Sequence, residues 1–273
     1  MLSIKEVQCK SILTKSKLGG YAVNCYTGCI HGCVYCYARY MKKFTGHTEP
    51  WGKFVDVKIN SADVLQKQVQ RAKPDSVFMS SACDGWQQIE RKYRLSRECL
   101  SILLEHGFHV SILTKNANIR DDFDVLGGAD AKLGFTLTAM DDGLCRKIEP
   151  RASLTRDRID AIKEADKRGI KTWAFLGPFM PFLSDSEENL DALFKAVSEL
   201  NLENILVDHL NPKSGVWQSI KGFLGENYPY LIGFYGKMLY DSSERKIYSD
   251  GLRKIVERKA DKYRLTDKLK IVF

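Results

Sequence analysis

The sequence predicts an α/β protein, a partial (β/α)6 barrel with a C-terminal helical and strand extension covering its open side. Short apolar runs typical of β-strands alternate with amphipathic stretches typical of helices along most of the chain. The 273 residues are 44% hydrophobic, which is enough for one large core. Conspicuous polar residues follow directly after the apolar runs. This is expected where the carboxyl ends of parallel strands meet at one end of a barrel and bind a ligand there.

Six strands and four helices are predicted in alternation. The strands span 21–25, 76–80, 109–113, 132–138, 171–176 and 204–208. The helices span 62–72, 96–105, 155–167 and 186–200. We expect Ser184, three residues before Glu187, to cap the last helix as in a capping box. Strict alternation implies parallel strands joined by right-handed crossovers.

The chain ends are expected to pack around this barrel. We expect an N-terminal extension over 1–20, the barrel over 21–210 and a C-terminal extension over 211–273. Residues 209–235 are interpreted as a long connection with one short helix. From about Ser243 the pattern predicts a helix and then a short closing strand over 268–273.

Composition narrows the class of protein. With 42 Lys and Arg against 34 Asp and Glu, the formal charge is +8, which permits an acidic partner such as nucleic acid. An ordinary solvated basic surface is the alternative. No apolar run reaches the ~18 residues that cross a bilayer, and no leader-like segment opens the chain. We therefore expect a cytoplasmic monomer, without membrane attachment, whose eight cysteines stay reduced.

The most specific pattern is a group of three cysteines near the start of the chain: Cys29, Cys33 and Cys36. Three thiolates can hold three irons of a four-iron cubane and leave the fourth iron open. Gly28 and Gly32 give the loop the freedom to aim its sulfurs. Zinc, with His31 or another cysteine as fourth ligand, is the alternative, but no second Cys-x-x-Cys occurs in the sequence. The spacing favours an iron-sulfur cluster.

With Tyr35 at the aromatic position, Cys-x-x-x-Cys-x-aromatic-Cys resembles the cluster loop of the radical S-adenosylmethionine (SAM) enzymes. The surrounding string 24–39 resembles the branch that includes spore photoproduct lyase and the DNA repair photolyase-like proteins. The likeness continues through the segments Asp84-Gly85-Trp86-Gln87-Gln88-Ile89-Glu90, Leu113-Thr114-Lys115, Glu149-Pro150-Arg151 and Gly177-Pro178-Phe179-Met180-Pro181. It covers roughly the first two thirds of the chain and implies a barrel of the radical SAM type.

The resemblance implies an enzyme with one [4Fe-4S] cluster on the three cysteines and SAM at the open iron. Such enzymes cleave SAM reductively, and the resulting 5′-deoxyadenosyl radical abstracts hydrogen from a substrate. An external electron donor of the flavodoxin or ferredoxin type is implied. Branch and charge favour a nucleic acid or nucleotide substrate, while a peptide or small metabolite stays open. A zinc-stabilised nucleic-acid-binding module and an iron-sulfur redox sensor are alternatives from other classes.

Residues at the strand ends are the candidates for binding SAM. Lys115 is expected to hold the methionyl carboxylate, with a hydroxyl from Thr136 or Thr138 beside it. Ser80 and Ser81 stand where many radical SAM proteins carry a glycine-rich stretch that accepts the amino group. The resemblance therefore assigns these three strand ends to the methionyl part of SAM.

Other candidates surround the adenosyl part. The resemblance implies that Tyr35 and the turn formed by Gly177 and Pro178 lie near the adenine. Glu149 and Arg151 could hold the ribose hydroxyls or each other, and a structural ion pair is the equal alternative.

Two residues are candidates for contact with the substrate, Cys83 and His209. A thiol near the mouth can give a hydrogen atom to a substrate radical. The hydrogen donor of spore photoproduct lyase corresponds to Ser81 here, so that role is not carried over to Cys83. Either Asp208 or His209 is expected to contact substrate, with a structural pairing of the two as the alternative. Trp86 could stack on a base or fill its loop's core.

Overall fold

The computed structural model describes residues 2–17, 19–213 and 215–273. Within these ranges the main sheet has eight strands: β2 (Thr14–Lys15), β3 (Tyr21–Val23), β6 (Ser76–Met79), β7 (His109–Thr114), β8 (Ala131–Leu137), β9 (Lys171–Phe179), β10 (Leu202–His209) and β11 (Leu269–Ile271). Their order is β11-β10-β9-β8-β7-β6-β3-β2, and only β2 runs antiparallel to its neighbour.

The predicted partial barrel is confirmed. All six expected strands are present and lie side by side in chain order, from β3 to β10. In the described part of the chain the end strands β2 and β11 do not pair, so the sheet stays open. Six of the seven residues of β8 are buried, because helices and the barrel interior cover its two faces.

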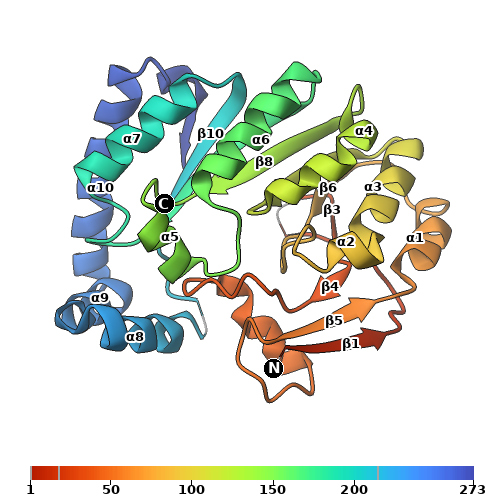
Figure 1. Ribbon diagram of the computed structural model, residues 1–273, viewed down its shortest axis with the longest axis horizontal. Helices are drawn as coiled ribbons and strands as arrows, with labels where there is room; N and C mark the ends of the chain where they lie inside the picture. The colour runs from red at the N-terminus through yellow and green to blue at the C-terminus, as the bar shows by residue number, and fades with distance from the viewer. Residues whose placement is uncertain (1, 18, 214) are drawn as a thin grey trace.

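Four predicted helices are confirmed: α1 (Ser61–Val69), α3 (Leu95–Glu105), α6 (Thr155–Lys167) and α7 (Glu187–Ser198). They pack with the short helices α2 (Glu90–Tyr93), α4 (Phe123–Leu126) and α5 (Asp142–Ile148) around the sheet (Figure 1). In α3 the buried residues Leu95, Cys99 and Leu103 recur every four positions and face the core. None of the described helices is long and apolar enough to span a bilayer.

The predicted cap of α7 is wrong. Ser186 is the N-cap, and its hydroxyl accepts a hydrogen bond from the Asn189 N–H at 3.2 Å. Ser184 is fully buried in the preceding loop, where its hydroxyl accepts from the Met180 N–H at 2.8 Å. Ser184 matched the spacing to Glu187, but the helix starts at Glu187, two residues later than that pattern requires.

A second, three-stranded sheet lies at the lower right of Figure 1 and was not predicted. It comprises β1 (Ser3–Val7), β5 (Phe54–Lys58) and β4 (Tyr26–Thr27), with β5 in the middle. The parallel pairing of β1 with β5 joins segments about fifty residues apart, which periodicity does not show. Because β4 ends just before Gly28, this sheet holds the start of the three-cysteine segment, called here the cysteine loop (28–36).

The C-terminal part contains more helix than predicted. Instead of one short helix, 209–235 contains all of α8 (Val216–Asn227) and the start of α9 (Ile232–Tyr240), which are joined by a 3-10 turn at Pro229–Leu231. Two glycines in α8, Gly222 and Gly225, weaken its helical signal, and packing against α9 supplies the stability. The predicted helix and closing strand are confirmed as α10 (Ser242–Lys262) and β11, which pairs with β10.

Candidate functional site

Two adjoining cavities lie at the carboxyl ends of the central strands. The smaller, about 100 Å³, is lined by the three cysteines of the cysteine loop and by His31, Trp51, Ser80, Ser81, Cys83 and Asp84. The larger, about 450 Å³, is lined by Tyr35, Thr136, Trp173, Pro178, Asp208, His209 and Asn211. Cys33, Cys36, Tyr37 and Lys115 line both cavities. Most of the residues predicted to form the site are therefore brought together.

The cysteine loop is held in a defined conformation. Gly28 and Gly32 have φ values of 91° and 64°, which confirms the predicted need for glycine. Gly52 packs so closely that a Cβ at position 52 would lie 2.7 Å from the Gly32 Cα. The Ile30 N–H donates to Gln87 Oε1 at 2.8 Å, and the Val34 N–H donates to the Ile148 carbonyl at 2.9 Å. The loop's sulfurs are thus presented from a rigid backbone.

The three thiols form a donor set suited to a metal cluster. Cys29 and Cys33 are buried and Cys36 is half-buried. Burial raises the pKa of all three, that of Cys33 to about 12, so a thiolate here needs a cationic partner. Among the described residues no three His, Cys, Asp or Glu side chains converge tightly enough for a single metal ion. Three thiols that line one cavity fit a cubane, whose irons occupy separate corners.

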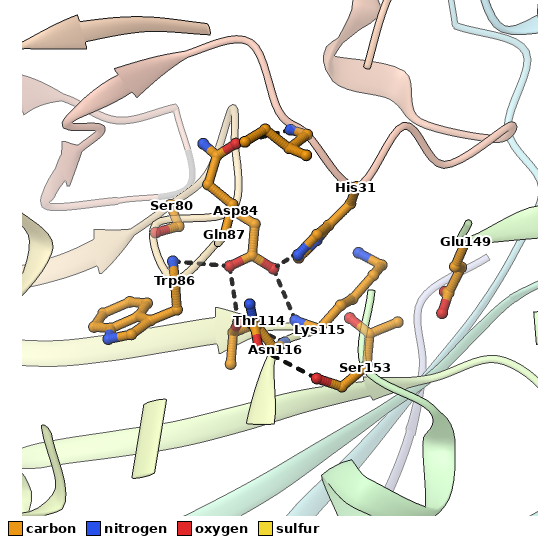
Figure 2. Close-up of polar contacts among 12 residues, drawn as sticks. His31, Ser80, Asp84, Trp86, Gln87, Thr114, Lys115, Asn116, Glu149 and Ser153 are labelled. Atoms are coloured by element: carbon orange, nitrogen blue, oxygen red, sulfur yellow. Dashed lines mark hydrogen bonds and ion pairs between the residues drawn. The ribbon is translucent and has the colours of Figure 1, made fainter. Parts of the chain in front are cut away.

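Asp84 connects three segments around the smaller cavity (Figure 2). Its Oδ1 accepts hydrogen bonds from the Trp86 N–H at 3.0 Å and the Thr114 hydroxyl at 2.8 Å. Its Oδ2 accepts from the Lys115 N–H at 2.8 Å and lies 3.4 Å from His31 Nδ1. Burial lowers the pKa of His31 to about 4, so its ring is neutral beside Asp84. The carboxylate therefore fixes Lys115 relative to the cysteine loop.

Lys115 places a positive charge where the two cavities meet. Burial acts to lower the pKa of its ammonium, but Cys33, Glu149 and Asp84 together raise it above its ordinary value. Its Nζ lies 5.9 Å from the centre of the Tyr35 ring. Within the described residues no hydrogen bond or ion pair engages Nζ, so this charge is available to an anionic ligand.

Glu149 forms a buried ion pair with Arg158 on α6, and both side chains have no exposed area. The Tyr35 hydroxyl donates to Glu149, and Thr138 Oγ1 lies 2.9 Å from both Glu149 Oε1 and the Gly177 carbonyl. Of these residues only Tyr35 lines the larger cavity.

Arg151 does not pair with Glu149. Its Nη1 donates to the Ile30 carbonyl at 3.1 Å and the Gly52 carbonyl at 2.8 Å. These two hydrogen bonds connect the cysteine loop to the segment that contains Gly52. Glu149 makes its ion pair with Arg158 instead.

The candidates for substrate contact lie in different cavities. Cys83 lines the smaller one, its Sγ 3.8 Å from Asn24 Oδ1, and burial raises its pKa so that the thiol keeps its hydrogen. His209 lines the larger one, but its Nε2 lies 2.7 Å from Ser249 Oγ and its Nδ1 3.1 Å from the Leu210 carbonyl. Burial lowers the pKa of His209, so its ring is held neutral between these two partners.

Trp86 fills the core of its loop. It is 2% exposed, and its indole N–H donates to Asp122 Oδ2 at 2.8 Å. The buried position excludes the alternative in which this ring stacks on a ligand base.

A family model described as the radical SAM superfamily matches residues 23–213. The chain belongs to this superfamily. An uncharacterized protein of Methanocaldococcus jannaschii is 31% identical over 231 residues, which are 84% of this chain and 85% of that protein. An uncharacterized protein of Mycobacterium tuberculosis is 28% identical over 280 residues, covering 97% of this chain and 82% of that protein.

A solved spore photoproduct lyase variant with bound SAM and dinucleoside spore photoproduct shares the fold of this radical SAM protein. The TM-score is 0.71 at 14% identity, with 99% of this chain and 81% of that chain covered. At this identity the likeness shows the fold alone. Superfamily membership implies SAM and a [4Fe-4S] cluster as cofactors and supports an enzyme.

Sequence reasoning missed several residues of this radical SAM site. Trp173 lines the larger cavity from β9, opposite Gly134 of β8, where a side chain larger than glycine would overlap the indole. Asn211 Nδ2 donates hydrogen bonds to both carboxylate oxygens of Asp208, to Oδ2 at 3.1 Å and to Oδ1 at 3.2 Å. A tryptophan on a strand paired with a glycine on its neighbour is a signal that could have identified Trp173. Trp51 lies outside every recognised motif.

Proposed function

We propose that the protein is a radical SAM enzyme that holds its cluster on Cys29, Cys33 and Cys36 and SAM across the junction of the two cavities. The three thiols line the smaller cavity beside the ammonium of Lys115, which has no ion-pair partner in the described part of the chain, and this arrangement carries the proposal. When bound, the reduced cluster supplies the electron that splits SAM into methionine and a 5′-deoxyadenosyl radical, which takes hydrogen from the substrate.

The chain's own residues bind and orient SAM. The ammonium of Lys115 lies where it can bind the methionyl carboxylate, and Asp84 fixes the Lys115 backbone. Ser80 Oγ accepts from the Gly85 N–H at 2.9 Å and Ser81 Oγ accepts from Asn24 Nδ2 at 3.0 Å, so each hydroxyl keeps acceptor capacity for an amino group. The apolar walls of the larger cavity keep water away from the adenosyl part.

Lys115→Met is expected to weaken SAM binding because it removes the only cationic group assigned to the carboxylate. A hydrogen bond to a charged group contributes about 1.5–3 kcal/mol, so the Kd should rise roughly 10- to 150-fold. Anoxic isothermal titration calorimetry measures this change. Lys254→Met, an exposed lysine of α10, is the matched control and should leave the Kd unchanged. An unaltered Kd in Lys115→Met would contradict the assignment.

The proposed substrate is a nucleic acid or nucleotide. The formal charge of +8 suits a polyanion, and the larger cavity has aromatic walls at Phe78, Trp173 and Phe175 that suit a planar base. The protein shares its fold with spore photoproduct lyase, which was solved in complex with dinucleoside spore photoproduct, and this likeness of fold also favours a nucleotide-like substrate. A peptide or small metabolite is the second candidate, because the cavity's few polar groups also suit other ligands.

We also propose where the enzyme works, its oligomeric state and its electron donor. The enzyme works in the cytoplasm as a monomer and receives electrons from a flavodoxin or ferredoxin. Its catalytic unit is the barrel over 21–210, flanked by extensions at 1–20 and 211–273. Cys83, as a protonated thiol in the smaller cavity, is the candidate hydrogen donor, and His209 is a candidate for positioning substrate in the larger cavity.

Purification under nitrogen tests the proposal directly. We expect bound iron and sulfide, a brown protein, and 5′-deoxyadenosine after addition of dithionite and SAM. A colourless protein with zinc would overturn the cluster, and a brown protein that leaves SAM intact would indicate a redox sensor. For the substrate, perdeuterated oligonucleotides should transfer deuterium to 5′-deoxyadenosine, which mass spectrometry detects. Transfer from perdeuterated peptides instead would favour the second candidate.

A further inference from the structure

Trp51 forms part of the wall of the smaller cavity, next to the cysteine loop. The side chain is 8% exposed, and its ring packs edge-to-face on Phe54 with the centroids 5.8 Å apart. Its indole Nε1 is buried and has no hydrogen-bond partner among the described residues. A buried N–H without a partner costs free energy, which makes an acceptor supplied by a ligand the natural explanation.

Cys36 packs against the apolar cluster that contains Trp51, and both side chains line the smaller cavity. The buried indole N–H, which has no partner among the described residues, therefore lies near a sulfur that accepts hydrogen bonds more strongly as a thiolate. Cys36 is half-buried, whereas Cys29 and Cys33 are buried.

The position of Trp51 relative to the loop is fixed by its neighbour. Gly52 packs against Gly32, and the Gly52 carbonyl accepts from Arg151, which also binds the Ile30 carbonyl. The Lys53 N–H donates to the Pro50 carbonyl at 3.0 Å, closing the turn that carries Trp51. The indole therefore does not have to reorganise when charge appears on the sulfur.

We propose that the indole N–H of Trp51 donates a hydrogen bond to the sulfur of Cys36 in the cluster-loaded protein and raises the reduction potential of the cluster. Reduction adds negative charge that is shared by the sulfurs, so a fixed donor stabilises the reduced state more than the oxidised one. In this role Trp51 acts through Cys36 and is a positioning residue. The inference depends on the proposed function because it requires the cluster.

Trp51→Phe removes the N–H and keeps an aromatic ring. In the loaded variant, an anoxic redox titration followed by electron paramagnetic resonance should show a more negative potential. We expect the ratio of reduced to oxidised cluster at a fixed potential to fall about tenfold. For a one-electron couple this corresponds to a reduction potential about 59 mV more negative. Trp217→Phe is the matched control, since Trp217 lies on α8 and packs on Tyr240 at 6.3 Å. Its potential should equal that of the wild type.

A second measurement uses the wild-type protein, so it does not depend on how well the Trp51→Phe variant binds its cluster. With 15N-indole tryptophan, the reduced cluster should show a nitrogen coupling and an exchangeable proton coupling that D2O removes. Both should persist in Trp217→Phe. Absence of these couplings in wild type, or an unchanged potential in fully loaded Trp51→Phe, would overturn the inference. Failure of wild type to bind iron and sulfide would instead overturn the proposed function, and elemental analysis detects this before any titration.

Discussion

Cys33→Ala is expected to abolish the formation of 5′-deoxyadenosine from SAM and dithionite under anoxic conditions. Cys33 lines both cavities and is 5% exposed, and its thiolate would hold one iron of the cluster. Even the loss of a residue that only hydrogen-bonds to a metal's ligand costs about 10- to 100-fold in affinity or activity. Loss of a ligand should therefore reduce turnover by more than ~100-fold, together with the iron and sulfide content.

The control for this experiment is another cysteine outside the site. Cys9 is half-buried, and its backbone N–H donates to Asn60 Oδ1 at 2.8 Å, a bond that does not involve its thiol. Cys9→Ala should retain iron, sulfide and turnover. Undiminished 5′-deoxyadenosine formation by Cys33→Ala would count decisively against ligation by the cysteine loop.

The barrel could be predicted from sequence because its information is local. Each strand is a short apolar run and each crossover helix repeats its apolar residues every three or four positions, as Leu95, Cys99 and Leu103 do in α3. The small sheet could not be predicted in this way, because β1 finds its partner β5 about fifty residues away. The helices α8 and α9 were underestimated because each depends on packing against the other.

The site was predictable where function requires a fixed spacing. The cysteine loop and Lys115 follow such spacings, and both line the smaller cavity. Trp51 reaches that cavity from a turn after the loop, where no local pattern marks it. Arg158 was hidden for another reason, since a charged residue on an amphipathic helix ordinarily indicates the solvated face. Its burial depends on the register of α6 against the sheet, which the sequence does not reveal.

Arg158→Met is expected to be the most destabilising single substitution considered. Arg158 Nη1 donates to the Thr136 carbonyl at 2.7 Å and Nε to the Ser153 carbonyl at 2.9 Å, while Nη2 pairs with Glu149. Methionine fills a similar volume but leaves the Glu149 carboxylate buried without its counter-charge. Breaking one side of a buried ion pair costs about 3–5 kcal/mol in free energy of unfolding, measurable by urea titration at pH 7.

The double variant Glu149→Gln, Arg158→Met separates the lost ion pair from a general packing defect. With no carboxylate left to bury, it should recover part of the lost free energy of unfolding. A double variant less stable than Arg158→Met would show that the uncompensated charge is not the cause.

The same pair predicts how stability depends on pH. Burial acts to raise the pKa of Glu149, but Arg158 and Lys115 outweigh it, so the folded-state pKa lies below the ordinary value of 4.5. A depressed carboxyl pKa contributes stability that is fully present above pH 4.5 and is lost as the pH falls through the folded-state value. Wild type should therefore lose more unfolding free energy below pH 4.5 than Glu149→Gln does. Because Tyr35 of the cysteine loop is bonded to this carboxylate, acid should loosen the loop as Glu149 is protonated. Parallel pH profiles of the two proteins would contradict this coupling.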